Sequence, residues 1–165
     1  MSVRTLQEPL KEGYRRDPRS SRITLTARGG SGDQPIACSV DIGRAVYEAQ
    51  AHAGVGGAGT GACSGDLLLG ALAACAQITC QMVADAMGLE VRGIEVTVEG
   101  DLDLQGTLGL DREVPVGFTD IRTHFAIDAP AASEDDLAAL RRKTERYCVV
   151  MQTLTTPPAL TTTWS

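Results

Sequence analysis

One long apolar segment, residues 67–87, constrains the fold of this chain more than any other feature. The segment predicts a helix from Asp66 to Met87, which Ser64 or Asp66 caps at its start and Gly88 ends in a left-handed conformation. The segment approaches the length that spans a membrane, but its polar residues Gln77, Gln81 and Asp85 favour a buried core helix. Because the helix is apolar on nearly every side, we expect a sheet to cover one face and a partner subunit another.

The remaining segments predict one α+β domain over residues 1–165, with a mostly antiparallel sheet beside the long central helix. Residues 1–20 read as a solvated arm, residues 28–33 as a turn and the glycine-rich residues 54–65 as a crossing loop. Alternating or β-branched patterns predict strands over 23–27, 36–42, 91–104, 118–127 and 159–164, and helical patterns follow Ser133 and Cys148.

Charge and composition exclude several classes of protein. A net charge of −6 argues against a nucleic-acid or anionic-membrane partner. No apolar signal segment follows Met1, and the five cysteines form no CxxC pair and no closed disulfide set, so we expect a cytoplasmic protein with free thiols. Neither histidine has metal-ligand spacing, and the glycine-rich loop matches no phosphate-binding motif, so we expect neither a metal nor a bound cofactor.

The cysteines differ in the chemistry that their positions favour. Cys38 in a strand and Cys63 in the glycine-rich loop are typical of small apolar fillers. Cys75 and Cys80 share the long helix but point about 140° apart, so one of them faces the core. Cys75 ends the run SGDLLLGALAAC, and Cys148 opens a helical segment directly after the helix that follows Ser133.

The order of strands and helices, together with the positions of Cys75 and Cys148, resembles that of the OsmC/Ohr family of hydroperoxide-reducing proteins. In that family a helix of the form PEELLxAALAAC carries the reactive cysteine, and a CPVS-like helix start carries the second. The resemblance implies a thiol peroxidase that reduces organic hydroperoxides: Cys75 becomes a sulfenic acid, Cys148 condenses with it to a disulfide, and an external dithiol, lipoyl-type in the family, restores both. It also implies an intertwined homodimer with active sites at the subunit interface.

A reactive Cys75 must be a thiolate, yet it lies more than two turns inside its helix, and burial raises a thiol pKa. We therefore expect a cation nearby. The family uses an arginine from the early hairpin turn, which indicates Arg28, with Arg44 and Arg22 as rivals and an exposed turn arginine as the alternative.

The carboxylate that holds this arginine in the family departs from the pattern here. The family's Pro-Glu falls on Ser64 and Gly65, so Asp66 is one position late and acts either from that shifted place or only at the helix start. A second departure is Val149 in place of the proline after the second cysteine.

Two other functions stay open. The shifted carboxylate favours a stress-associated or small-molecule-binding protein that keeps the fold without efficient peroxidase activity. A cysteine hydrolase would need an oriented histidine, and neither His52 nor His124 has a motif for that role.

Overall fold

The computed structural model describes residues 3–31, 37–43 and 45–164. These residues form two compact units, each of which is described by itself. The first unit comprises Met1–Pro9, Ala71–Thr97 and Thr123–Ser165, and the second comprises Leu10–Gly70 and Val98–Arg122. The extension of a single domain over residues 1–165 stays a prediction.

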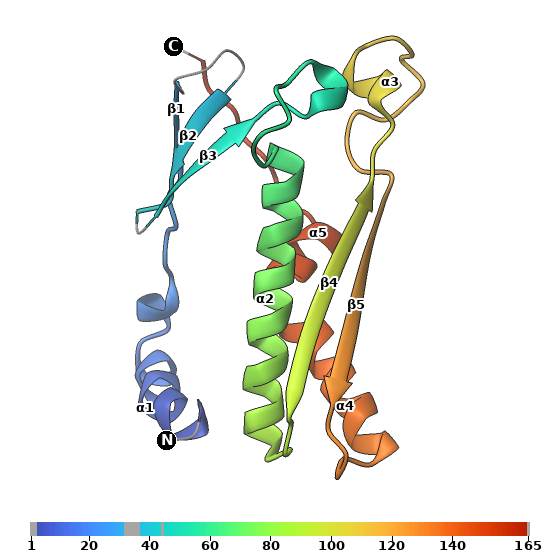
Figure 1. The fold of residues 1–165 in the computed structure, drawn as a ribbon. Helices are drawn as coiled ribbons and strands as arrows, with labels where there is room; N and C mark the ends of the chain where they lie inside the picture. Colours follow the sequence, from blue (N-terminus) through green and yellow to red (C-terminus); the bar gives the residue numbers. More distant parts are fainter. Residues whose placement is uncertain (1–2, 32–36, 44, 165) are drawn as a thin grey trace. The chain divides into compact units, whose positions relative to one another are not determined.

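The long helix α2 (Ser64–Met87) is the predicted apolar helix; it begins two residues before the predicted start at Asp66 and ends at Met87 as expected (Figure 1). At its end, Gly88 adopts a φ of 72°, its N–H donates to the Asp85 carbonyl at 3.0 Å, and the Leu89 N–H donates to the Ala84 carbonyl at 3.0 Å. This pair of bonds is a Schellman motif, which requires a residue at positive φ and therefore favours glycine.

Only one face of α2 is buried within the chain. Its buried residues recur every fourth position, at Leu72, Ala76, Cys80 and Ala84. The side chains of Ile78 and Met82 remain 54% and 37% exposed. By length and composition, α2 is the one helix among the described residues that could cross a membrane, a test that the core helix of a soluble protein also passes.

The core of the first unit forms around the buried side chains of Cys80, Ala84 and Leu140. Leu140 lies on α4 (Glu134–Tyr147), which is followed by the short helix α5 (Val149–Thr155). The strands β4 (Gly93–Asp101) and β5 (Asp120–Asp128) pair in a two-stranded antiparallel sheet. The partly buried apolar residues that pack on this core are Val83, Met87, Leu89, Val91, Ile94, Phe125 and Ile127.

The second unit contains an antiparallel sheet in the order β1-β2-β3. Its strands are β1 (Arg28–Ser31), β2 (Ala37–Asp41) and β3 (Val46–Gln50). After the sheet come a 3₁₀ turn, η2 (Ala53–Val55), and the start of α2, and the short helix α3 (Leu104–Thr107) follows β4.

Three segments differ from the sequence-based prediction. Residues 23–27 are not a strand, and β1 instead begins at Arg28, within the segment predicted as a turn. Strand β3 was not predicted, because its residues VYEAQ show only a short alternation. Residues 159–164 form no strand in the described chain, and Leu160 and Trp164 are 93% and 94% exposed, so Trp164 covers no sheet edge there.

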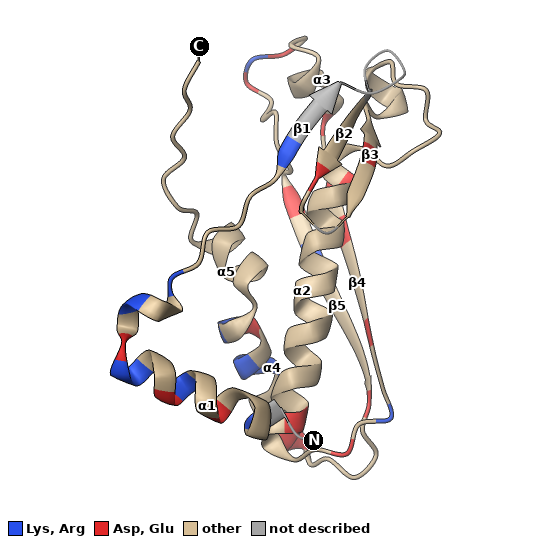
Figure 2. Ribbon diagram, turned by 90° about the vertical axis from the view of Figure 1, so that its left-hand side faces the viewer, with Lys and Arg blue, Asp and Glu red and all other residues tan. Residues whose placement is uncertain are grey.

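The N-terminal segment, which was predicted as a solvated arm, contains a helix and a 3₁₀ turn. Helix α1 (Val3–Arg16) is followed by the 3₁₀ turn η1 (Pro18–Ser21), and α1 carries both basic and acidic residues (Figure 2). Within the first unit, the Arg4 guanidinium donates to the Ala86 carbonyl at 2.7 Å.

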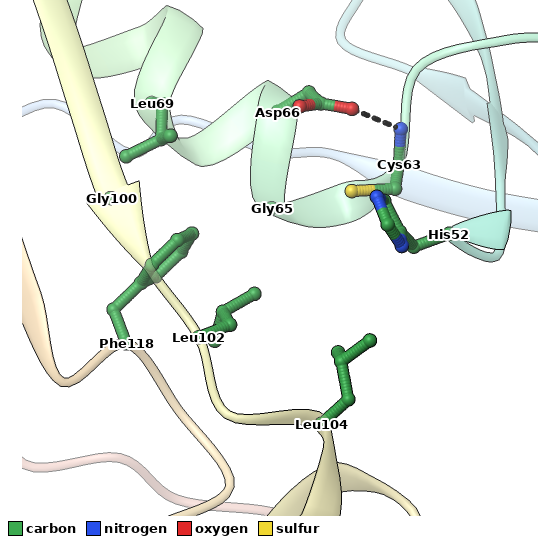
Figure 3. A pocket seen from close by; sticks show the side chains of 9 residues that line it. All are labelled: His52, Cys63, Gly65, Asp66, Leu69, Gly100, Leu102, Leu104 and Phe118. Atoms are coloured by element: carbon green, nitrogen blue, oxygen red, sulfur yellow. Dashed lines mark hydrogen bonds between the residues drawn. The ribbon is translucent and has the colours of Figure 1, made fainter. Parts of the chain in front are cut away.

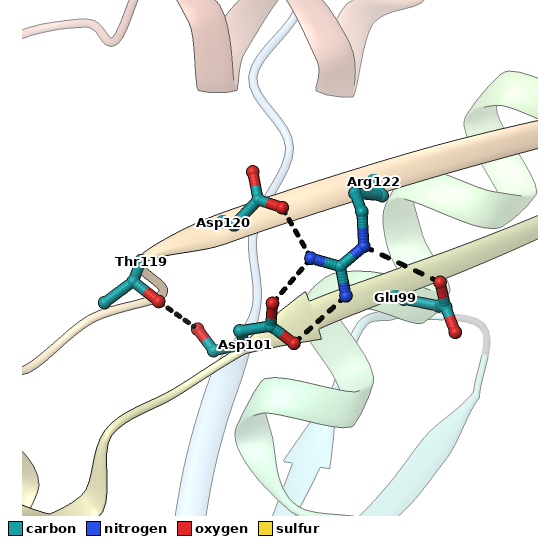
Figure 4. A network of polar contacts seen from close by, with 5 residues as sticks. All are labelled: Glu99, Asp101, Thr119, Asp120 and Arg122. Atoms are coloured by element: carbon teal, nitrogen blue, oxygen red, sulfur yellow. Dashed lines mark hydrogen bonds and ion pairs between the residues drawn. The ribbon is translucent and has the colours of Figure 1, made fainter.

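An exposed ion-pair network connects β4 and β5 in the second unit (Figure 4). The Arg122 guanidinium donates to both carboxylate oxygens of Asp101, at 2.5 and 3.0 Å, and also contacts Asp120 and Glu99. The pKa of Asp101 is lowered by this hydrogen bond to Arg122. Because these side chains are about half exposed, solvent screens the network, and it contributes to register more than to stability.

The start of α4 gives the first testable prediction. The Ser133 side chain accepts from the Asp136 N–H, and the Asp136 carboxylate accepts from the Ser133 N–H, which completes a capping box. Replacing Ser133 by alanine should lower the free energy of unfolding by about 1 kcal/mol, measured by urea denaturation. The exposed change Thr162→Ala is the control, and an equal loss in both variants would contradict the role of the cap.

Candidate active site

The structure brings Cys75 and Cys148 together within the first unit. Cys75 lies midway along α2 and is partly buried, whereas Cys148 lies between α4 and α5 and has no exposed surface. Both cysteines are reduced, and their side chains form a hydrogen bond with each other. This contact joins the two thiols that the sequence analysis singled out, while their catalytic roles stay predictions.

The first turn of α5 supplies further hydrogen bonds to Cys75. The first N–H groups of a helix lack partners within it, and the Cys148 side chain forms no capping bond to α5. Hydrogen bonding by the backbone N–H groups of Val150 and Val149 lowers the pKa of the Cys75 thiol. The sulfur therefore lies at the N-terminal end of α5, where partial positive charge favours an anion.

A side-chain hydroxyl completes the surroundings of the Cys75 sulfur. Thr79 follows Cys75 by one helical turn, and its Oγ1 lies 4.0 Å from the Cys75 Sγ. Thr79 was missed by the sequence analysis, although its position four residues after the cysteine on the same helix is a usable signal.

These contacts separate the two thiols in acidity. Burial raises the pKa of Cys75, but the hydrogen bonds from Val150, Cys148, Thr79 and Val149 together outweigh it and leave the pKa below its ordinary value. Burial also raises the pKa of Cys148, and the neighbouring Cys75 raises it further. The arrangement therefore lets Cys75 ionise at lower pH than Cys148, which keeps its proton longer as the pH rises.

Hydrogen bonds within the described residues thus lower the pKa of Cys75, while the expected nearby cation stays a prediction. In the described chain, the groups that lower this pKa are backbone N–H groups, a thiol and a hydroxyl. Hydrogen bonds to the charged form stabilise it as a nearby positive charge does.

The predicted activating arginine has a different local structure from the one expected. Arg28 is the first residue of β1 rather than a turn residue; it is exposed and lies opposite Asp41 in the register of β1 and β2. Its rival Arg22 is also exposed, and Arg44 lies outside the described residues. An activating role for Arg28 stays a prediction.

Asp66 performs the helix-start function that was one of its two predicted roles. Its Oδ2 accepts the Cys63 N–H at 2.8 Å, directly before the first turn of α2, and this bond lowers the pKa of Asp66. The interaction is one half of a capping box. A further role for Asp66 in holding an arginine stays a prediction.

Comparison with known proteins places this chain in a family. The family model described as OsmC-like protein matches residues 57–163, which include both cysteines, and the chain therefore belongs to the OsmC-like family. No match was found among curated proteins.

Solved structures show the same fold at low sequence identity. An OsmC-like protein from Mycoplasma pneumoniae has 18% identity and a TM-score of 0.67 over 82% of this chain and 89% of its own. An organic hydroperoxide resistance protein OsmC from Legionella pneumophila has 18% identity and a TM-score of 0.62 over 82% and 92%. A third, an organic hydroperoxide resistance protein from Elizabethkingia anophelis, has 17% identity and a TM-score of 0.61 over 83% and 91%.

The acidity of Cys75 is directly testable. Alkylation by iodoacetamide, followed over pH by peptide mass spectrometry, should show Cys75 ionising below the pH at which an ordinary thiol ionises. Replacing Thr79 by valine removes one hydrogen bond to the thiolate and should move the ionisation of Cys75 to higher pH. The matched control Thr97→Val, at an exposed position of β4, should not change it. An unchanged profile in Thr79→Val would contradict the assigned contact.

Proposed function

We propose that this OsmC-like protein is a thiol-dependent peroxidase that reduces organic hydroperoxides with Cys75 and Cys148. One observation supports the proposal above the others: a partly exposed thiol of lowered pKa contacts a buried thiol of raised pKa. The family membership and the fold shared with organic hydroperoxide resistance proteins agree with this function.

In the first step, the Cys75 thiolate attacks the distal oxygen of the hydroperoxide. A sulfur–oxygen bond forms, the oxygen–oxygen bond breaks, and the alkoxide takes a proton from solvent to leave as an alcohol. Only the thiolate is a competent nucleophile, so the hydrogen bonds that lower the pKa of Cys75 raise the reactive fraction.

In the second step, Cys148 attacks the sulfur of the Cys75 sulfenic acid. The new disulfide forms as hydroxide leaves, and the Cys148 thiol proton converts the hydroxide to water. Because Cys148 already contacts Cys75, this step needs little movement. An external dithiol, of the lipoyl type by the family resemblance, then reduces the disulfide by exchange and becomes oxidised itself.

The reaction predicts the behaviour of three variants. With tert-butyl hydroperoxide and dihydrolipoamide, the unaltered protein should consume peroxide, and Cys75→Ser should reduce consumption to the uncatalysed background. Cys148→Ser should accumulate a sulfenic acid at Cys75 that a dimedone probe labels. Cys38→Ser, which alters a thiol on β2, is the control. Full activity in Cys75→Ser would exclude the proposed nucleophile, whereas no peroxide consumption by the unaltered protein would favour the alternative of a binding protein.

We further propose that the protein is cytoplasmic, where thiols stay reduced. We also propose that two copies associate through the exposed face of α2 that contains Ile78 and Met82. The exposed apolar side chains of Ile78 and Met82 support association, because water-exposed apolar surface of this kind favours burial against a partner.

Analytical ultracentrifugation tests this association. The chain of 17.3 kDa should sediment at twice that mass, and Ile78→Glu should shift it to the monomer by placing a charge in the apolar contact. Gln105→Glu adds the same charge at an exposed polar position of α3 and should remain a dimer. A monomer in the unaltered protein would contradict the proposal.

A further inference from the structure

The second unit contains a cavity that the peroxidase chemistry does not use. It has a volume of about 240 Å³ and lies between the first turns of α2, the end of β4 and the segment before β5 (Figure 3). Its walls are apolar and come from Leu69, Leu102, Leu104 and Phe118. Ligand cavities in proteins combine such walls with a few polar groups that orient the ligand.

Two glycines keep the cavity open. A Cβ at Gly100 would lie 2.6 Å from the Phe118 ring, and a Cβ at Gly65 would lie 3.3 Å from the same ring and 3.4 Å from the Cys63 sulfur. Any larger residue at Gly100 would therefore displace Phe118.

Three groups able to hydrogen-bond line one end of this cavity: Cys63, Asp66 and His52. In Figure 3, the Cys63 sulfur points into the cavity, and the His52 ring lies beside it. The lowered pKa of Asp66 makes its carboxylate an anion, and therefore an acceptor only, at neutral pH. The Asp66 carboxylate is already positioned by the Cys63 N–H.

The hydrogen bonding of His52 defines which ring nitrogen carries its proton. The His52 Nδ1 accepts the Gly54 N–H at 3.0 Å, so the neutral ring carries its proton on Nε2 and donates from there. The polar end thus offers an acceptor from Asp66 and a donor from His52. A hydroxyl group, which both donates and accepts, satisfies this pair.

We propose that this cavity binds a short-chain aliphatic alcohol, with its hydroxyl at Asp66 and His52 and its alkyl chain against the leucines and Phe118. The volume of about 240 Å³ lies below the usual range of ligand cavities, which favours a short chain. A carboxylic acid of equal length is excluded, because its anion would meet the Asp66 carboxylate. Binding here does not depend on Cys75 or Cys148.

Cys63 reports occupancy of the site, because its sulfur lines the cavity. The full chain is alkylated with N-ethylmaleimide with and without 1-hexanol, and each cysteine is followed by peptide mass spectrometry. At ten times its Kd, the alcohol should slow alkylation of Cys63 about tenfold, because only the unoccupied protein reacts. Cys38, a partly buried thiol of the same unit outside the cavity, is the internal control.

Hexanoate at the same concentration should give no protection. Equal protection by hexanoate, equal slowing of Cys38, or no protection of Cys63 would each overturn the proposal. In Cys75→Ser, 1-hexanol should still protect Cys63 from alkylation. Loss of peroxidase activity and loss of alcohol binding can therefore be told apart.

Two variants test the shape of the cavity. Gly100→Ala should abolish protection, whereas the matched change Gly117→Ala, where a Cβ meets open space, should keep it. Leu104→Ala enlarges the cavity and should shift the preference from 1-hexanol towards 1-octanol. If Gly100→Ala fails to fold, Leu104→Ala becomes the test of the site. An unchanged preference for 1-hexanol over 1-octanol in Leu104→Ala would overturn the proposal.

Discussion

The proposed chemistry depends on the lowered pKa of Cys75, to which hydrogen bonds from the first turn of α5 contribute. Burial alone would keep Cys75 protonated and unreactive, as the raised pKa of Cys80, which buries its thiol in the same helix, illustrates. At Cys75 the hydrogen bonds from Val150, Cys148, Thr79 and Val149 together reverse this effect. The same turn of chain positions Cys148 against Cys75, so one structural element supplies both the activation of the first thiol and the second thiol of the pair.

The burial of Cys148 adds a second constraint. Cys148 has no exposed surface, so a substrate in solvent meets Cys75 first. In the proposed reaction, the raised pKa of Cys148 keeps its proton in place until a sulfenic acid forms beside it, and that proton then leaves with the departing oxygen as water. The difference in acidity and exposure therefore assigns an order to the two cysteines that a symmetric pair would lack.

Much of this arrangement could be predicted from the sequence, because it rests on local patterns. The Gly88 end of α2 and the Ser133 cap follow from residue spacing, but spacing shows only that one of Cys75 and Cys80 faces the core, and the structure shows that it is Cys80. The backbone contacts to Cys75 could not be predicted, since any residue supplies an N–H and only tertiary packing decides which one reaches the sulfur. For this reason the sequence led us to expect a cation beside Cys75, and it gave no sign of the backbone N–H groups of α5 that lower its pKa. The terminal segment 159–164 alternates like a strand, but it pairs with no strand in the described chain.

The account makes one central claim, that a hydroperoxide oxidises Cys75 and Cys148 to a disulfide. The direct measurement is peptide mapping under non-reducing conditions after one equivalent of an organic hydroperoxide has been added to the fully reduced protein. The account predicts a single new cross-linked pair that joins the peptides containing Cys75 and Cys148, with Cys38, Cys63 and Cys80 still reduced. A disulfide between other cysteines, or recovery of Cys75 as an unoxidised thiol while peroxide is consumed, would contradict it.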